Sequence, residues 1–104
     1  MSLKEVQKEV DVWTKQFKIQ YWEPYEILAR LMEETGELAR EINHIYGEKK
    51  KKSSEAKKEL GEEMADIIFT LACLANSHNI DLDEYFKKVM DKCYGRDNNR
   101  YDRK

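Results

Sequence analysis

The sequence predicts an all-α protein whose protomer has four helices, two long and two short, and assembles into an oligomeric helical bundle. Apolar residues recur at steps of three and four, capping residues precede these stretches, and no stretch shows the alternation of a strand. The chain has 104 residues, of which 38% are charged and 40% hydrophobic, and its net charge is -2. These values predict one small domain over residues 1–104.

The first two predicted helices have clear local signals at their ends. Ser2 and Glu5 form a capping box before a helix over 3–17. Pro24 suits the first turn of a helix over 24–46, and Gly47 ends it. The second helix also carries a seam of apolar residues at bundle spacing, namely Leu28, Leu31, Leu38, Ile42 and Ile45.

The third predicted helix, 55–77, follows a run of four lysines, Lys49 to Lys52. We interpret this run as a solvated loop, since charge runs usually lie in water, and Ser53 or Ser54 can cap the helix after it.

The fourth predicted helix begins at a capping box of Asp81 and Glu84 and ends at Gly95. The fourth helix is therefore short, like the first.

The stretch 59–75 should form the centre of the fold, because apolar residues surround most of its helical circumference. Asp66 interrupts the apolar run. An ionised carboxylate buried in such a helix is costly unless it is paired or bound to a metal, so we expect Asp66 to be buried beside a partner.

Two acidic pairs should lie at the same height of a helical hairpin. Glu34 and Glu37 precede the end of their helix by about ten residues, and Glu63 and Asp66 follow the start of the next by about nine, at about 1.5 Å per residue. Four converging carboxylates would suit Mg²⁺ or Mn²⁺. The alternative is that these acids make ordinary surface pairs with lysines.

Other features indicate the class of protein and its compartment. No stretch approaches the roughly 20 apolar residues of a membrane helix, and the N-terminus lacks the apolar core of a signal peptide. Cys73 and Cys93 lack metal-site spacing and suit free thiols in a reducing compartment. We therefore expect a cytoplasmic protein with neither a membrane nor a nucleic-acid polymer as partner.

The acidic pattern is specific enough to resemble a known family. Glu33-Glu34-x-x-Glu37 followed by Glu63-x-x-Asp66 resembles the EExxE…ExxD signature of MazG-like nucleotide pyrophosphohydrolases, in the all-α NTP pyrophosphatase superfamily. The surrounding stretches ARLMEETGELAREIN and EEMADIIFTLACLAN are similar as well, and the resemblance covers nearly the whole chain.

The resemblance implies a homo-oligomer, a dimer or in some relatives a tetramer, with a nucleoside triphosphate as substrate. It implies Mg²⁺-dependent cleavage to a monophosphate and pyrophosphate, in keeping with housecleaning of the nucleotide pool. By position, the implied metal ligands are Glu34, Glu37, Glu63 and Asp66, and Glu33 would hold a second metal or activate water. Since some relatives have tandem domains, the preferred base and sugar stay open.

Three basic residues near the C-terminus form a candidate phosphate site: Lys92, Arg96 and Arg100. Residues 87–104 carry seven Lys or Arg against three Asp, so this tail can approach phosphates or merely be a solvated terminus. The proton of the attacking water would pass to one of three acids, which the sequence does not separate: Glu33, Glu59 and Glu62.

Two apolar features bear on assembly. An aromatic cluster around the first helix junction is more typical of core or dimer packing, with stacking on a nucleobase as the alternative; it comprises Trp13, Phe17, Tyr21, Trp22 and Tyr25. Phe69 lies on the outer side of the helix 55–77 and predicts an oligomer contact. The alternative function is a non-catalytic helical module that dimerises through this helix.

Overall fold

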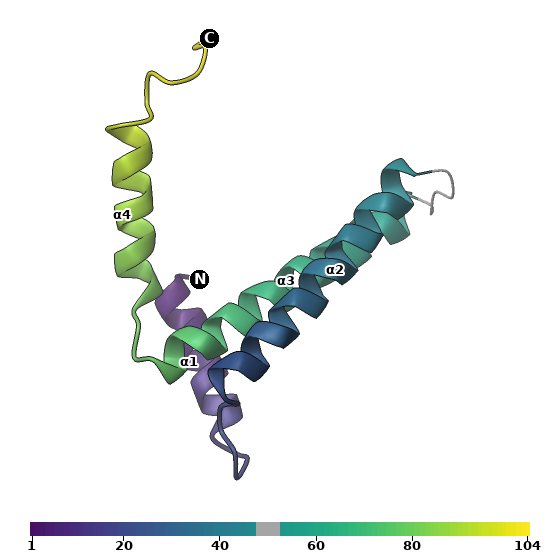
Figure 1. Ribbon diagram of the computed structural model, residues 1–104, viewed down its shortest axis with the longest axis vertical. Coiled ribbons are helices and arrows are strands. Elements are labelled where there is room, and N and C mark those ends of the chain that lie inside the picture. Colours follow the sequence, from purple (N-terminus) through teal and green to yellow (C-terminus); the bar gives the residue numbers. More distant parts are fainter. Residues whose placement is uncertain (48–52) are drawn as a thin grey trace.

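Four α-helices make up the described part of the chain, and two of them, α2 and α3, form a long antiparallel hairpin (Figure 1). The computed structural model describes residues 1–47 and 53–104, with the side chains of 53–57 left out. The helices span Leu3–Thr14 (α1), Pro24–Tyr46 (α2), Ser53–Ser77 (α3) and Leu82–Tyr94 (α4). The predicted all-α class, with two long and two short helices, is confirmed.

Helix α1 begins as predicted and ends three residues early. The Ser2 hydroxyl accepts from the Glu5 amide at 3.1 Å and Glu5 Oε1 accepts from the Ser2 amide at 3.3 Å, which completes the capping box. The predicted end at residue 17 is wrong. The amide of Phe17 bonds to the Thr14 carbonyl, a three-residue step that tightens the chain into a turn instead of continuing the helix.

Helices α2 and α3 pack along each other and set the position of the acidic residues. Pro24 and Gly47 delimit α2 where predicted, and the Gly47 amide donates to the Asn43 carbonyl at 2.6 Å. Helix α3 begins at Ser53, two residues before the predicted start. The predicted lysine loop and the Ser53 or Ser54 side-chain cap lie outside the described residues.

Helix α4 attaches to the rest of the protein through its first turn. Asp81 Oδ1 caps it by accepting from the Asp83 amide at 3.0 Å, in place of the predicted box with Glu84. The Asp83 carboxylate in turn accepts from the amides of Leu3 and Lys4, both at 3.2 Å, at the N-terminus of α1. No described residue of α4 is buried, and the helix points away from the hairpin (Figure 1).

The hairpin has one apolar face that the protomer leaves uncovered. A group of large apolar side chains of α2 and α3 is exposed there: Leu28, Met32, Met64, Ile68 and Leu71. At about 100° per residue they lie on the side of each helix away from Glu37 and Asp66. The radius of gyration is 16.9 Å, against about 13 Å for a compact chain of 100 residues. No described helix has the length and apolar content of a membrane span.

Candidate active site: an acidic cluster beside an aromatic cleft

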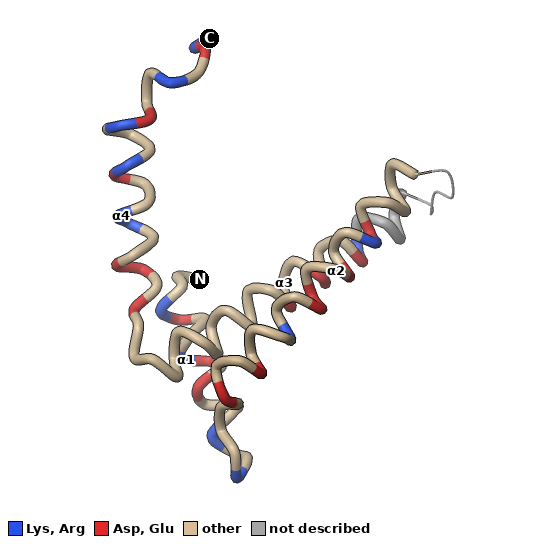
Figure 2. The backbone as a smooth tube through the Cα atoms, viewed as in Figure 1, with Lys and Arg blue, Asp and Glu red and all other residues tan. Residues whose placement is uncertain are grey.

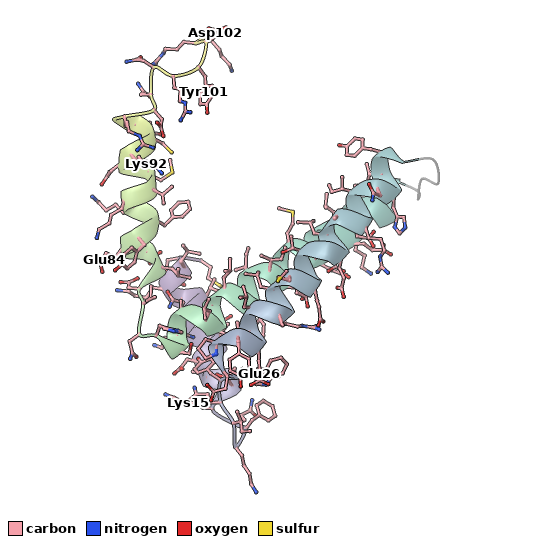
Figure 3. All side chains as sticks on the ribbon, viewed as in Figure 1. Lys15, Glu26, Glu84, Lys92, Tyr101 and Asp102 are labelled. Carbon is pink, nitrogen blue, oxygen red and sulfur yellow. The ribbon has the colours of Figure 1, made fainter. Side chains whose placement is uncertain are left out.

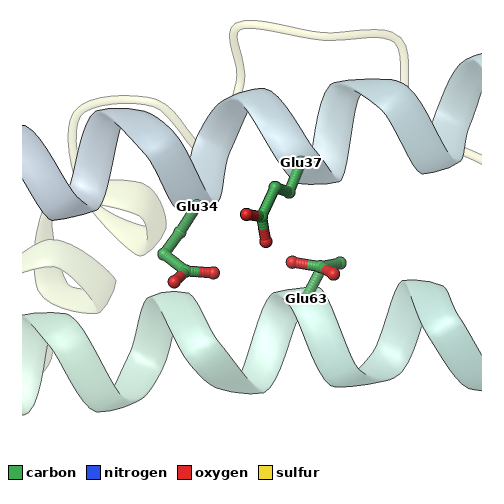
Figure 4. Close-up of side chains that lie close together, drawn as sticks. All are labelled: Glu34, Glu37 and Glu63. Carbon is green, nitrogen blue, oxygen red and sulfur yellow. The ribbon is translucent and has the colours of Figure 1, made fainter.

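Three carboxylates converge near the middle of the hairpin, Glu34 and Glu37 from α2 and Glu63 from α3. Each offers an oxygen, and these three oxygens all lie within 4.8 Å of one another (Figure 4). The antiparallel pairing of two helices with similar offsets from their connection produces this meeting, as the residue count predicts. Glu34, Glu37 and Glu63 therefore meet where their spacing in the sequence predicts.

Glu34 is the most deeply buried acid of the cluster, with 2% of its surface exposed. Arg30 Nη2 lies 2.7 Å from Glu34 Oε1, whereas Glu34 Oε2 is buried and accepts no hydrogen bond from the described residues. Burial raises the pKa of Glu34; Arg30 opposes that shift, and the charges of Glu37 and Asp66 add to it. One oxygen of the Glu34 carboxylate is thus buried with no donor among the described residues.

Glu63 is in a similar state on the opposite helix. Its Oε2 atom is buried and has no hydrogen-bond partner among the described residues. Burial raises the pKa of Glu63, and its hydrogen bond with Glu37 and the charges of Glu37 and Asp66 raise it further. Buried carboxylate oxygens of this kind cost free energy unless a cation or a proton neutralises them. The donor set therefore fits a hard divalent cation.

Asp66 and Glu33 border the cluster without joining it. Asp66 is exposed and lines the neighbouring cleft, and its charge acts on the pKa of both Glu34 and Glu63. The expectation that Asp66 is buried is wrong, because the side of α3 that carries it faces an open cleft and not a packed helix. Glu33 is exposed and lies 3.3 Å from Arg30 Nη1.

A cleft of about 660 Å³ begins at the acids and continues along α1 and α3. Glu34, Asp66 and Arg30 line it, and its other lining residues include five aromatic side chains, namely Trp13, Phe17, Tyr21, Trp22 and Phe69. Trp13 meets Phe17 and Phe69 edge to face, with ring centroids 5.0 and 6.0 Å apart.

The rings of the aromatic cluster are not packed into the protomer core. Trp13, Phe17 and Trp22 keep about half of their surface exposed, at 53%, 51% and 55%, so that dimer packing and nucleobase stacking stay as the two predictions for them. Phe69, predicted as an oligomer contact, lies against Trp13 in the same cleft. The sequence feature that indicates this exposure is the interleaving of aromatic and polar residues over 13–22, which a buried helix face does not show.

The predicted phosphate-binding residues lie at the far end of α4. Lys92 is in its last turn, and Arg96 and Arg100 follow it, where both approach Asp97 Oδ1, at 3.2 and 3.8 Å (Figures 2 and 3). All three are exposed. Within one chain they are not brought to the acidic cluster, because α4 points away from the hairpin.

Two of the three candidate proton acceptors lie on α3. Glu62 is exposed and Glu59 is partly buried, and Glu59 takes part in interactions of its own. Geometry in the protomer leaves the choice among Glu33, Glu59 and Glu62 open.

Comparison with known proteins identifies the family. Residues 23–101 match the MazG nucleotide pyrophosphohydrolase domain. YpjD of Bacillus subtilis (strain 168) is 50% identical over 103 residues, which cover 99% of this chain and 93% of that protein.

Two solved structures share the fold. The crystal structure of YpjD from Bacillus subtilis is 51% identical with a TM-score of 0.79, covering 88% of this chain and 94% of that one. The crystal structure of the Bacillus-conserved MazG protein, a nucleotide pyrophosphohydrolase, is 46% identical with a TM-score of 0.77, and 88% of each chain is covered. The chain therefore belongs to the MazG nucleotide pyrophosphohydrolase family and is a hydrolase.

Proposed function

We propose that the protein hydrolyses a nucleoside triphosphate to the monophosphate and pyrophosphate in the presence of Mg²⁺, with Mn²⁺ as a substitute. The observation that carries this proposal is the pair of buried carboxylate oxygens, on Glu34 and Glu63, that have no hydrogen-bond partner among the described residues, in a cluster whose Glu34 also lines an aromatic cleft. A divalent cation would neutralise the acids and bind the phosphates, and a nucleobase would stack on the aromatic rings.

The acids would hold the cation through Glu34, Glu37 and Glu63, with Asp66 as the fourth carboxylate at the edge of the cleft. The cation would supply neutralisation of the phosphate charge and a lowered pKa of bound water. Mg²⁺ usually binds only a few protein carboxylates and keeps positions for phosphates and water, which this set of ligands allows. One of Glu33, Glu59 and Glu62 would accept the proton of the attacking water.

The aromatic half of the cleft would hold the nucleobase. Trp13, Phe17, Trp22 and Phe69 present exposed ring surface within one cavity that also contains Glu34 and Asp66. Stacking on such rings contributes about 1–3 kcal/mol per base and tolerates different bases. Arg30, 2.7 Å from Glu34 and also in the cleft lining, would contact a phosphate between the two halves.

A second copy of the chain would complete the assembly. The exposed apolar face defined by Leu28, Met32, Met64, Ile68 and Leu71 lies on the hairpin side opposite the acids, so a dimer formed there leaves the cleft open. Because Lys92, Arg96 and Arg100 point away from the acids of their own chain, their phosphate contact would be made in the partner's site. The free Cys73 and Cys93 agree with a reducing, cytoplasmic setting.

The direct test is a panel of ribo- and deoxyribonucleoside triphosphates, together with damaged nucleotides, assayed for both pyrophosphate and orthophosphate with Mg²⁺ or EDTA. We expect pyrophosphate as the first product, only with the cation, and none from Asp66→Asn. That variant should stay folded and melt at or above the wild-type temperature in EDTA, because Asp66 is exposed and its charge repels those of Glu34 and Glu63. Orthophosphate as first product, or full activity in EDTA, would overturn the proposal.

A further inference from the structure

A chain of polar contacts connects the cleft to the junction of α1, α3 and α4. The Tyr21 hydroxyl donates to Asp11 Oδ1 at 2.7 Å and accepts from Asn76 Nδ2 at 2.9 Å. Asn76 is itself fixed on both sides of its amide, since Nδ2 donates to the Gln7 carbonyl and Oδ1 accepts from Gln7 Nε2, each at 2.9 Å. The hydroxyl of Tyr21 thus connects α1, through Asp11, with α3, through Asn76.

Gln7 extends the same contacts to the start of α4. Its Nε2 also donates to the Ile80 carbonyl at 2.7 Å, and its Oε1 accepts from the Leu82 amide at 3.0 Å. Gln7 is buried, so these bonds are shielded from competing water. Gln7 therefore holds Asn76, at the end of α3, beside the first turn of α4, and Asn76 in turn holds the hydroxyl of Tyr21.

The segment 15–23 depends on this anchor for its position. It has no regular helix, and most of its residues are exposed. Yet it supplies a large part of the cleft lining, namely Phe17, Ile19, Gln20, Tyr21 and Trp22. A second tether supports Tyr21, because Gln20 Nε2 donates to Asp11 Oδ1 at 2.9 Å. Because most of the segment is exposed, its hydrogen bonds, together with the contact of Phe17 with Trp13, hold its conformation.

We propose that Tyr21, held between Asp11 and Asn76, is a positioning residue that fixes the aromatic wall of the cleft for the nucleobase. The proposal rests on the proposed function, since it assigns a role within the nucleotide cleft. The Tyr21 hydroxyl forms hydrogen bonds with Asp11 and Asn76, neither of which is named as a metal ligand. Its loss should therefore weaken binding of the base and leave binding of cation and phosphates intact.

Tyr21→Phe is the appropriate perturbation, because it keeps the ring in the cleft lining and removes only the hydroxyl. Tyr21 makes one hydrogen bond to a carboxylate and one to an amide, and their loss removes the restraint on the ring, so a loss of about 5- to 20-fold in nucleotide affinity is expected. KM should rise by a similar factor while kcat stays within about twofold. Tyr46→Phe, at the exposed far end of α2, is the matched control and should change neither constant.

Two ligands separate a positioning role from a general loss of structure. Binding of a non-hydrolysable nucleoside triphosphate and of inorganic tripolyphosphate, each with Mg²⁺, is measured by calorimetry and by the fluorescence of Trp13 and Trp22. Tyr21→Phe should weaken the nucleotide only and reduce its quenching of the tryptophans. Equal weakening of both ligands, or unchanged nucleotide affinity, would overturn the inference.

A second pair of variants acts on the acceptor. Asp11 accepts a hydrogen bond from Tyr21 but is not among the residues that line the cleft. Asp11→Ala should therefore cause the same selective loss of nucleotide affinity, even if Tyr21→Phe folds poorly. Asp11→Asn keeps a carbonyl acceptor and should recover most of the affinity. Asp11→Ala with wild-type affinity contradicts the inference. Failure of the wild-type protein to bind or cleave any nucleotide would instead refute the proposed function.

Discussion

Glu37→Gln should make the protein more stable without Mg²⁺ and less stable with it. Glu37 has an oxygen within 4.8 Å of oxygens of both Glu34 and Glu63. Two charges at about 4 Å repel by about 4 kcal/mol at the effective dielectric of a protein surface, and sharing of a proton within the cluster already relieves part of this repulsion. We therefore expect a net gain of about 1–2 kcal/mol when Gln replaces Glu.

This gain translates into an easily measured change. For a domain of this size about 1 kcal/mol shifts the melting temperature by roughly 4–8 °C. In EDTA the variant should melt about 5–10 °C above the wild type. Mg²⁺ at 100 times its dissociation constant would stabilise the wild type by about 2.7 kcal/mol, and the variant far less, since it has lost a ligand.

The assay is differential scanning fluorimetry in EDTA and over a Mg²⁺ titration, with pyrophosphate release measured on the same samples. Glu9→Gln, which removes one exposed acid from α1, controls for net charge and should follow the wild type in every condition. Two results would show that the three carboxylates do not form a cation site. One is a Glu37→Gln protein that melts below the wild type in EDTA, and the other is a melting temperature that Mg²⁺ raises as much in this variant as in the wild type.

Three further predictions concern pH, the basic tail and assembly. The pKa of Glu34 and of Glu63 is raised above the ordinary value of 4.5, so the folded state binds these protons more tightly than the unfolded chain. Without metal, these two carboxyls therefore contribute stability at low pH that is lost as pH rises through their raised folded pKa values; the melting temperature in EDTA should fall as the pH is raised above the ordinary value of 4.5, and a rise would contradict the assignment. Arg96→Ala and Arg100→Ala should raise KM with an unchanged melting temperature, since both residues are exposed and would contact phosphates; an unchanged KM would favour a merely solvated tail. Ile68→Glu should convert an oligomer into a species of 12.5 kDa in light scattering, because it places a charge on the exposed apolar face; a wild-type protein that is already an active monomer would exclude that interface.

Local chemistry explains why much of the fold followed from the sequence. Ser2 with Glu5 starts α1, and Pro24 and Gly47 delimit α2, because a cap or a missing amide proton acts within one helical turn. The meeting of Glu34, Glu37 and Glu63 followed as well, since the rise per residue is constant and two helices joined by a short connection must pair antiparallel.

Tertiary structure alone decided which of these side chains are buried. Asp66 sits in a run of apolar residues that predicts burial, but α1 reaches only the C-terminal end of α3 and leaves the side of α3 carrying Asp66 open to the cleft. The path of α4 was equally hidden from local signals, because its first turn is held by hydrogen bonds of Asp83 and of Leu82 with residues of α1, about eighty residues away in the chain.

The sequence by itself determined the helices, the acidic cluster and the family, because each depends on periodicity, on caps or on a short motif. Only the tertiary structure decided that the aromatic residues line a cleft and that Tyr21, Asp11 and Asn76 support it. Single polar residues such as Asn76 carry no periodic pattern, and their roles come from partners that folding brings together across 55 positions of sequence. Packing between distant segments, and not local propensity, therefore makes this cleft.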